Sequence, residues 1–275
     1  MDAKEVDREA VLQTLGGPEV VAGMSPEARA DALEDFLFVE LAERMKERPG
    51  HGYPSAADIV AQTETRRCRV GVGSLFVGSR NQNVKPLPPM PAAPTLEDFF
   101  RLRFPAYTNH CLQSASLALK NGADEEVVLA CLLHDTGQAL MKVDHGWWCA
   151  QLYEPYVSEK VAFAIRYHQA LRFYPDEEAG YVYPEIYRHL FGEDYQPEPY
   201  IEATYQMVRK HKWYDLAREV TVNDLYSFEE GVNPEFEQFA DIVGRRFRQP
   251  KEGLGFDGSP VAHMWRSLMM PDRPL

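Results

Sequence analysis

From Leu96 onward, the chain is a succession of segments in which apolar residues recur at the three- and four-residue spacing of an α-helix. These segments are TNHCLQSASLALKNG, DEEVVLACLLHDTG, HGWWCAQLYEPY, SEKVAFAIRYHQAL, a long EPYIEATYQMVRKHKWYDLAREVTVNDLYSF and PEFEQFADIVGRRFR. After residue 80 we find no alternation typical of a β-strand and no repeat at a fixed period. The pattern predicts an all-α fold for residues 96–275.

The first 95 residues have a different character. Ser25, Pro26 and Glu27 are typical of the N-cap and first positions of a helix, and ARADALEDFLFVELAERMKE follows them with helical spacing. The chain then loosens into a connector that ends in the proline-rich KPLPPMPAAP. We therefore expect a mainly helical N-terminal extension with its connector over residues 1–95, and a helical domain over residues 96–275.

Charge and cysteine content narrow the classes of function. The formal net charge of -13 would repel phosphate backbones, so nucleic acid is not an expected partner, although a local basic pocket could hold a small anion. The 4 cysteines form no CxxC pair, the N-terminus is charged from its second residue, and no run approaches 18 apolar residues. These features predict a reduced, cytoplasmic protein that acts on a small molecule, without a membrane partner. They leave the oligomeric state open.

Four histidines stand on four different helical segments, with similar spacing within each pair. His110 and His134 lie 24 positions apart, and His145 and His168 lie 23 apart, so a bundle can bring all four imidazoles together. Asp135 follows His134 at the end of the apolar run VVLACLLHD, where polar groups require partners. Its two oxygens could bridge two cations, and a mixture of imidazole and carboxylate suits iron, zinc or manganese better than calcium.

An acid is the expected sixth ligand, and two aspartates qualify. Asp224 lies in VTVNDLYSF among apolar residues and is preferred, whereas Asp215 in HKWYDLARE lies closer to lysine and arginine and is the alternative. Taken alone, the pair His134 and Asp135 could equally be a polar helix terminus. The whole set favours a metal site built from His110, His134, Asp135, His145, His168 and Asp224.

The order of these residues, and the strings around them, resembles the HD-domain superfamily. The strings are His110-Cys-Leu-Gln113-Ser-Ala115, Leu132-Leu133-His134-Asp135-Thr-Gly137 and His145-Gly-Trp-Trp-Cys149-Ala150-Gln-Leu152. They look like the oxygenase branch, which contains inositol oxygenase and the oxygenases that cleave hydroxylated organophosphonates, although Cys149 replaces a glycine of the third string. Asp224-Leu-Tyr also resembles the segment around the last ligand of inositol oxygenase. The resemblance covers about residues 100–230.

The resemblance implies a helical HD fold that holds two iron ions. One iron would be bound by His110, His134, Asp135 and Asp224 and the other by His145 and His168, with Asp135 bridging them. It further implies a mixed-valent Fe(II)/Fe(III) pair with O2 as co-substrate, and oxidative cleavage of a C–C or C–P bond beside a hydroxyl group. Asp135 would then belong to the catalytic centre itself.

Three more residues are expected to act on a ligand or on the substrate. Gln113 lies one helical turn from His110 and could orient a ligand of the catalytic centre, or be a solvated helix residue. Arg172 lies four residues after His168, where phosphonate-cleaving relatives place a substrate-binding lysine. It predicts a clamp for an anionic substrate, or alternatively a surface salt bridge. Gln138 stands where relatives touch the substrate through a lysine or histidine.

Two other classes of function remain open. The same six ligands could hold two divalent metals that activate a water, which would make the protein a phosphohydrolase acting on a phosphate ester. HxxQxA at His110, and Gln138 in place of the lysine often found in HD hydrolases, favour the oxygenase over this alternative. A non-catalytic helical module is the third interpretation.

Overall fold

The structure is a computed structural model, and it divides the chain into two units, residues 1–58 with 272–275 and residues 59–271, each described by itself. The residues that it describes are 8–25, 28, 29, 32, 36, 75, 87–184, 187, 188, 195–225, 227 and 229–271. In the first unit, two short helices are described, α1 (Arg8–Thr14) and α2 (Pro18–Gly23). Ser25 then accepts a hydrogen bond from the Ala28 N–H at 3.2 Å, as expected of an N-cap. Most of the helix predicted after it, and of the connector, lies outside the described residues.

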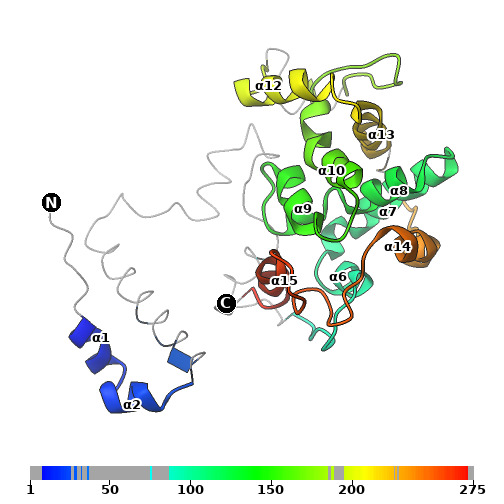
Figure 1. Cartoon of the computed structure of the whole chain (residues 1–275). Coiled ribbons are helices and arrows are strands. Elements are labelled where there is room, and N and C mark those ends of the chain that lie inside the picture. Colours follow the sequence, from blue (N-terminus) through cyan, green and yellow to red (C-terminus); the bar gives the residue numbers. More distant parts are fainter. Residues whose placement is uncertain are drawn as a thin grey trace. The chain divides into compact units, whose positions relative to one another are not determined.

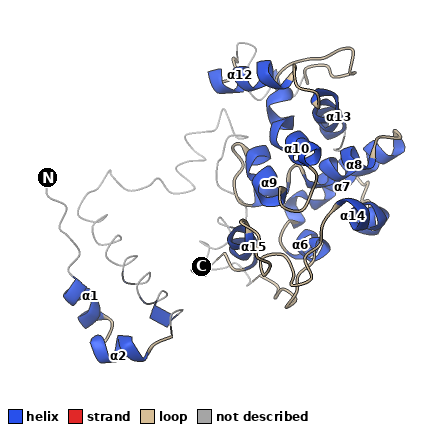
Figure 2. Ribbon diagram, in the orientation of Figure 1, coloured by secondary structure: helices blue, strands red, loops and turns tan. Residues whose placement is uncertain are grey.

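In the described residues of the second unit, helices are joined by loops and turns, and there is no strand (Figure 2). The prediction of an all-α fold is therefore confirmed. The helices are α6 (Leu96–Leu102), α7 (Pro105–Lys120), α8 (Glu125–Leu133), α9 (His145–Tyr153), α10 (Glu159–Leu171), α12 (Pro199–Val208), α13 (Tyr214–Leu225), α14 (Ala240–Arg246) and α15 (Ala262–Met269), with the 3₁₀ turns η2 (Thr136–Ala139) and η3 (Phe236–Phe239).

Helix α8 is the centre of this unit. Its residues from Val127 to Leu133 are all buried, which explains why this segment is apolar on every side. Helices α7, α10, α13 and α14 pack against it (Figure 1). His134 and Asp135 therefore follow directly on a fully buried segment of the apolar core.

The long helix predicted to end at Phe228 is divided in two. Helix α12 ends at Val208, and α13 begins at Tyr214. In the turn between them, the N–H groups of Lys210 and His211 donate to carbonyls three residues earlier, which tightens and ends the helix. The ring of His211 stacks on Phe163 of α10, with 4.1 Å between centroids. The apolar spacing of the sequence continues across the break, so it does not indicate this tertiary contact.

None of the helices within the described residues combines the length and the apolar character that a membrane crossing requires.

Candidate metal centre

The six predicted ligands come from five helices of the second unit. His110 lies in α7, His134 directly follows α8, His145 opens α9, His168 lies in the last turn of α10, and Asp224 lies near the end of α13. All but His110 are buried, and the exposed fractions of Asp135 and Asp224 are 7% and 8%. Every predicted ligand is thus at the cluster, and two groups within it could each hold a metal ion.

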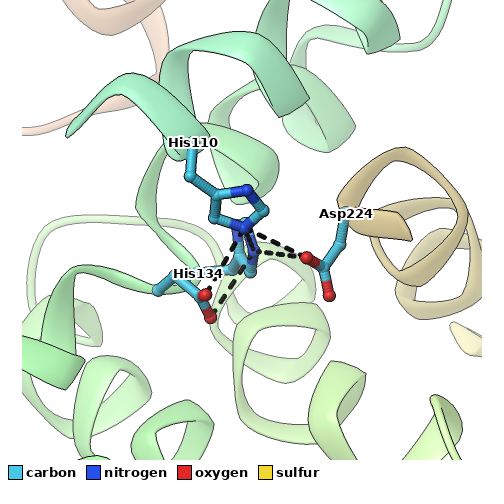
Figure 3. Close-up of side chains that lie close together, drawn as sticks. His110, His134 and Asp224 are labelled. Atoms are coloured by element: carbon cyan, nitrogen blue, oxygen red, sulfur yellow. Dashed lines mark hydrogen bonds and ion pairs between the residues drawn. The ribbon is translucent and has the colours of Figure 1, made fainter. Parts of the chain in front are cut away.

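His110, His134, Asp135 and Asp224 form the first group, in which His110, His134 and Asp224 converge on one point (Figure 3). The Nε2 atom of His110 lies 3.0 Å from Oδ1 of Asp224 and 3.4 Å from Oδ2 of Asp135. Nε2 of His134 lies 3.3 Å from Nε2 of His110 and 3.6 Å from Oδ1 of Asp224.

Asp135, His145 and His168 form the second group. Oδ1 of Asp135 lies 2.9 Å from Nε2 of His145 and 3.4 Å from Nε2 of His168. Oδ2 of the same carboxylate faces His110 in the first group. Oδ1 also lies 3.5 Å from Nε2 of His134, so Asp135 belongs to both groups.

Backbone carbonyls fix which nitrogen of each imidazole faces the cluster. The Nδ1 atoms of His134, His145 and His168 lie 2.8, 2.8 and 2.7 Å from the carbonyl oxygens of residues 131, 142 and 165. Because a carbonyl can only accept, each Nδ1 carries the proton and donates it. In the neutral imidazole, Nε2 is then left with its lone pair toward the cluster, as a metal ligand requires.

Ser227 performs the same function for His110. The serine hydroxyl donates to the carbonyl oxygen of Asp224 at 2.6 Å, so its oxygen can accept from Nδ1 of His110 at 3.0 Å. The Ser227 carbonyl lies 3.2 Å from the same Nδ1 atom. Ser227 thus links His110 to Asp224, a connection that its place three residues after Asp224 in VTVNDLYSF does not by itself indicate.

The donor set fits a cation. With protons on Nδ1, two pairs of Nε2 lone pairs face each other, His110 with His134 and His145 with His168, each at 3.3 Å. Oδ1 of Asp135 is buried and accepts no hydrogen bond among the described residues, although Nε2 of His145 is 2.9 Å away. A positive ion would satisfy all of these atoms together.

The pKa values show how strongly the cluster attracts positive charge. Burial lowers the pKa of His110, but hydrogen bonds and charges from Asp135 and Asp224 outweigh burial and raise it to about 10. Burial raises the pKa of Asp135 and Asp224, but the neighbouring histidines outweigh it and hold both well below the usual range. Burial, only partly opposed by Asp135, lowers the pKa of His168 to about 4.

Two glycines allow the close approach of the backbone segments that carry the ligands. A Cβ atom at Gly146 would lie 2.8 Å from the carbonyl oxygen of Ile165 and 3.1 Å from the His168 ring, so α9 meets α10 only because this residue has no side chain. At Gly137, a Cβ would lie 2.6 Å from Sγ of Cys149, which accepts a hydrogen bond from the Gly137 N–H at 2.8 Å. The sequence analysis gave Gly146 no role. Its position directly after His145, a predicted ligand, could have indicated one.

Gln113 binds backbone groups near the candidate ligands. Its amide nitrogen donates to the carbonyl oxygens of Glu229 and Val232 at 2.9 and 2.8 Å, and its amide oxygen accepts from the Glu229 N–H. The side chain is 7% exposed, so it is not the solvated residue of the alternative interpretation. Gln113 therefore holds the backbone of Glu229 and Val232, shortly after Ser227, whose hydroxyl and carbonyl oxygens lie beside Nδ1 of His110.

Gln138 and Arg172 lie at a pocket of about 850 Å³ that reaches the second group through His145. The Gln138 amide donates to Oδ2 of Asp135, so it both supports the shared carboxylate and lines the pocket. The Arg172 guanidinium lies 5.1 Å from the centroid of the Phe173 ring and 5.4 Å from that of Tyr187. Its Nε atom is buried without a hydrogen-bond partner in the described part of the chain. No described acid forms the surface salt bridge of the alternative interpretation.

Asp215 lies away from the cluster. It is exposed in the first turn of α13, nine residues before Asp224, which corresponds to about 13 Å along a helix. The structure therefore brings Asp224, and not Asp215, to the histidines.

Comparisons of the chain with models of known protein families and with curated proteins found no match.

Proposed function

We propose that the protein is an HD-domain, non-haem diiron oxygenase. It would use O2 to cleave a C–C or C–P bond next to a hydroxyl group in a small anionic substrate. The observation that carries this proposal is the pair of His/Asp groups that share Asp135, with every Nδ1 held by an oxygen acceptor. The strings around His110, His134 and His145, which resemble the oxygenase branch, favour this activity among those that such a ligand set supports.

Iron is the metal proposed for both groups. His110, His134, Asp135 and Asp224 would hold one ion, and Asp135, His145 and His168 the other. When bound, a mixed-valent Fe(II)/Fe(III) pair supplies the redox chemistry with O2 that no side chain can provide. The chain aims its ligands by the Nδ1 hydrogen bonds and excludes water by burying them at the end of α8.

The substrate would be held by Arg172 and Gln138. Arg172 presents a positive charge that no described carboxylate pairs, in a pocket that His145 also lines. A guanidinium binds a carboxylate, phosphonate or sulfonate through two parallel hydrogen bonds. With the anionic group at Arg172, the neighbouring hydroxyl would point toward His145 and the shared carboxylate. Such positioning supplies a large part of the rate of an oriented reaction.

Metal content together with electron paramagnetic resonance tests the proposal. The protein would be purified aerobically, partially reduced with ascorbate and compared with and without candidate hydroxylated acids. We expect about two irons per chain and a mixed-valent signal that changes when the acid is added. Two zinc, manganese or magnesium ions without such a signal would refute the oxygenase.

The alternative function is that of a phosphohydrolase, and the presence of Arg172 in the pocket supports it. A partly buried arginine in the pocket that His145 lines would bind a phosphate ester as well as a carboxylate. Two divalent ions would then lower the pKa of a bridging water for attack on phosphorus. Release of phosphate from a panel of phosphate esters, without O2 consumption, would establish this function instead.

A further inference from the structure

The pocket that reaches the candidate metal centre is built from three helix ends. The N-terminus of α9 contributes His145, Trp147 and Trp148, the end of α10 leads to Arg172, and the N-terminus of α12 contributes Tyr200 and Ile201. Its volume of about 850 Å³ lies at the upper end of the roughly 300–1,000 Å³ that holds drug-sized ligands. A polyol or acid of two to six carbons would leave much of this space empty.

The lining residues differ in chemistry and in exposure. His145 belongs to the second group and is buried, Gln138 donates to Asp135, and Arg172 lines the same pocket. Three other lining residues are large, apolar or amphipathic and exposed to solvent: Val143 by 40%, Trp147 by 45% and Tyr200 by 51%. Large hydrophobic side chains that gather at one exposed place mark a binding surface, whereas scattered ones are ordinary.

Charge in the pocket favours an anion at one position. Both lining acids bind tyrosine hydroxyls: Asp144 accepts from Tyr200 at 3.0 Å, and Glu198 accepts from Tyr195 at 3.2 Å. The Arg172 guanidinium has aromatic rings beside it and no described carboxylate, and its Nε is buried without a partner. Lys142 and Arg166 line the pocket as well, so its cations outnumber its acids. A ligand that fills the pocket can place its negative group next to Arg172 and has apolar contacts available at Trp147 and Tyr200.

We infer that the substrate is an amphiphilic hydroxy acid, whose anionic head binds Arg172 and whose apolar tail lies along Trp147 and Tyr200. The inference rests on the proposed function for the placement of the hydroxyl group, and it adds the tail. Trp147 and Tyr200 are then specificity-determining residues. They select for tail length and take no part in the reaction.

The test is binding of a homologous series by isothermal titration calorimetry. The probes are glycolate, 2-hydroxybutanoate, 2-hydroxyhexanoate and 2-hydroxyoctanoate, added to the full, iron-loaded chain without O2. Each buried methylene should tighten binding by roughly threefold to fourfold. Trp147→Ala should flatten this dependence on length, whereas Arg172→Gln should weaken all members by a similar factor and leave the dependence unchanged.

Phe256→Ala is the matched control, because Phe256 is 46% exposed, as Trp147 is, and does not line the pocket. It should leave the series unaltered. Affinity that is independent of length, length dependence that survives Trp147→Ala, or failure of every acid to bind would overturn the inference. O2 consumption is recorded separately. Length-dependent binding without turnover would refute the oxygenase and support the tail site. Turnover without length dependence would support the oxygenase and refute the tail site.

Discussion

A single atom, Nδ1, determines what each histidine of the cluster can do. His134, His145 and His168 lie on different helices, yet in each the Nδ1 atom meets the carbonyl oxygen of the residue three positions earlier. The backbone of the ligand's own segment thus selects the tautomer, and the helix positions then direct the Nε2 atoms toward one another. For His110, the described acceptor oxygens are the hydroxyl and the carbonyl of Ser227, 117 residues away.

Asp135 is the residue whose loss should affect both groups. Asp135→Asn removes the carboxylate that the two groups share. Removal of a residue that merely supports a ligand lowers metal affinity by roughly 10- to 100-fold, so the loss in Asp135→Asn should be larger. In His168→Ala, only the second group loses a ligand, so the loss should be about half of the metal. Metal analysis after gel filtration measures both. Full occupancy in Asp135→Asn would disprove the site.

Arg172→Gln should weaken binding of 2-hydroxyhexanoate by about 10- to 100-fold, because a hydrogen bond to a charged group contributes roughly 1.5–3 kcal/mol. Its metal content should be unchanged. Arg166→Gln is the control in the same pocket, since Arg166 already has a partner in Glu154 at 3.7 Å. Equal losses in the two variants would mean that the pocket attracts anions by general charge and has no specific clamp.

At the scale of elements, the site depends on how closely neighbouring helices approach. Gly146 lets the first turn of α9 lie against the last turn of α10, which brings Nε2 of His145 to 3.3 Å from Nε2 of His168. A side chain here would meet a backbone carbonyl, which cannot rotate away. The second group therefore depends on one helix contact, while the first depends on the docking of α13 against α7 and α8.

Gly146→Ala should separate α9 from α10 and lower the free energy of unfolding by about 1–3 kcal/mol, the usual effect of overpacking. Metal should be lost from the second group before the first. Gly244→Ala provides the contrast, because Gly244 lies inside α14 with open space around it. That change should stabilise the protein by roughly 0.5–1 kcal/mol. Urea unfolding of both variants measures the difference, and two similar shifts would contradict the close-contact argument.

The sequence predicted the elements better than their ends and contacts. Helical spacing and the order of His110, His134, Asp135, His145, His168 and Asp224 were sufficient to predict an all-α domain and the members of the cluster. The division at Val208 was missed because the apolar spacing continues across it, and α15 was missed as a separate helix. Gln113 binds Glu229, and His110 binds Ser227, more than 100 residues away in each case. No local sequence pattern describes such contacts.

At the scale of the whole molecule, a bound metal should stabilise the second unit as one body, since its ligands come from five helices. In the absence of O2, added Fe(II) should raise the midpoint of thermal unfolding. A free Fe(II) concentration of 100 times Kd corresponds to a stabilisation of about 2.7 kcal/mol. Asp135→Asn should abolish most of this dependence. Differential scanning fluorimetry over an Fe(II) titration measures it. A midpoint that does not respond in the unchanged protein would contradict metal binding in the folded state.

The distribution of the ligands also has a consequence for how the protein is made. Asp224 meets His110 at 3.0 Å although more than 100 residues separate them, so the first group can exist only after a long loop has closed. Closing such a loop costs entropy before any contact compensates it, and folds with non-local contacts form slowly. During synthesis, a nascent chain that has not yet released α13 would have every histidine of the cluster but no complete first group. Metallation of the first group would therefore be confined to chains in which α13 has already docked, whereas the second group needs no residue of α13.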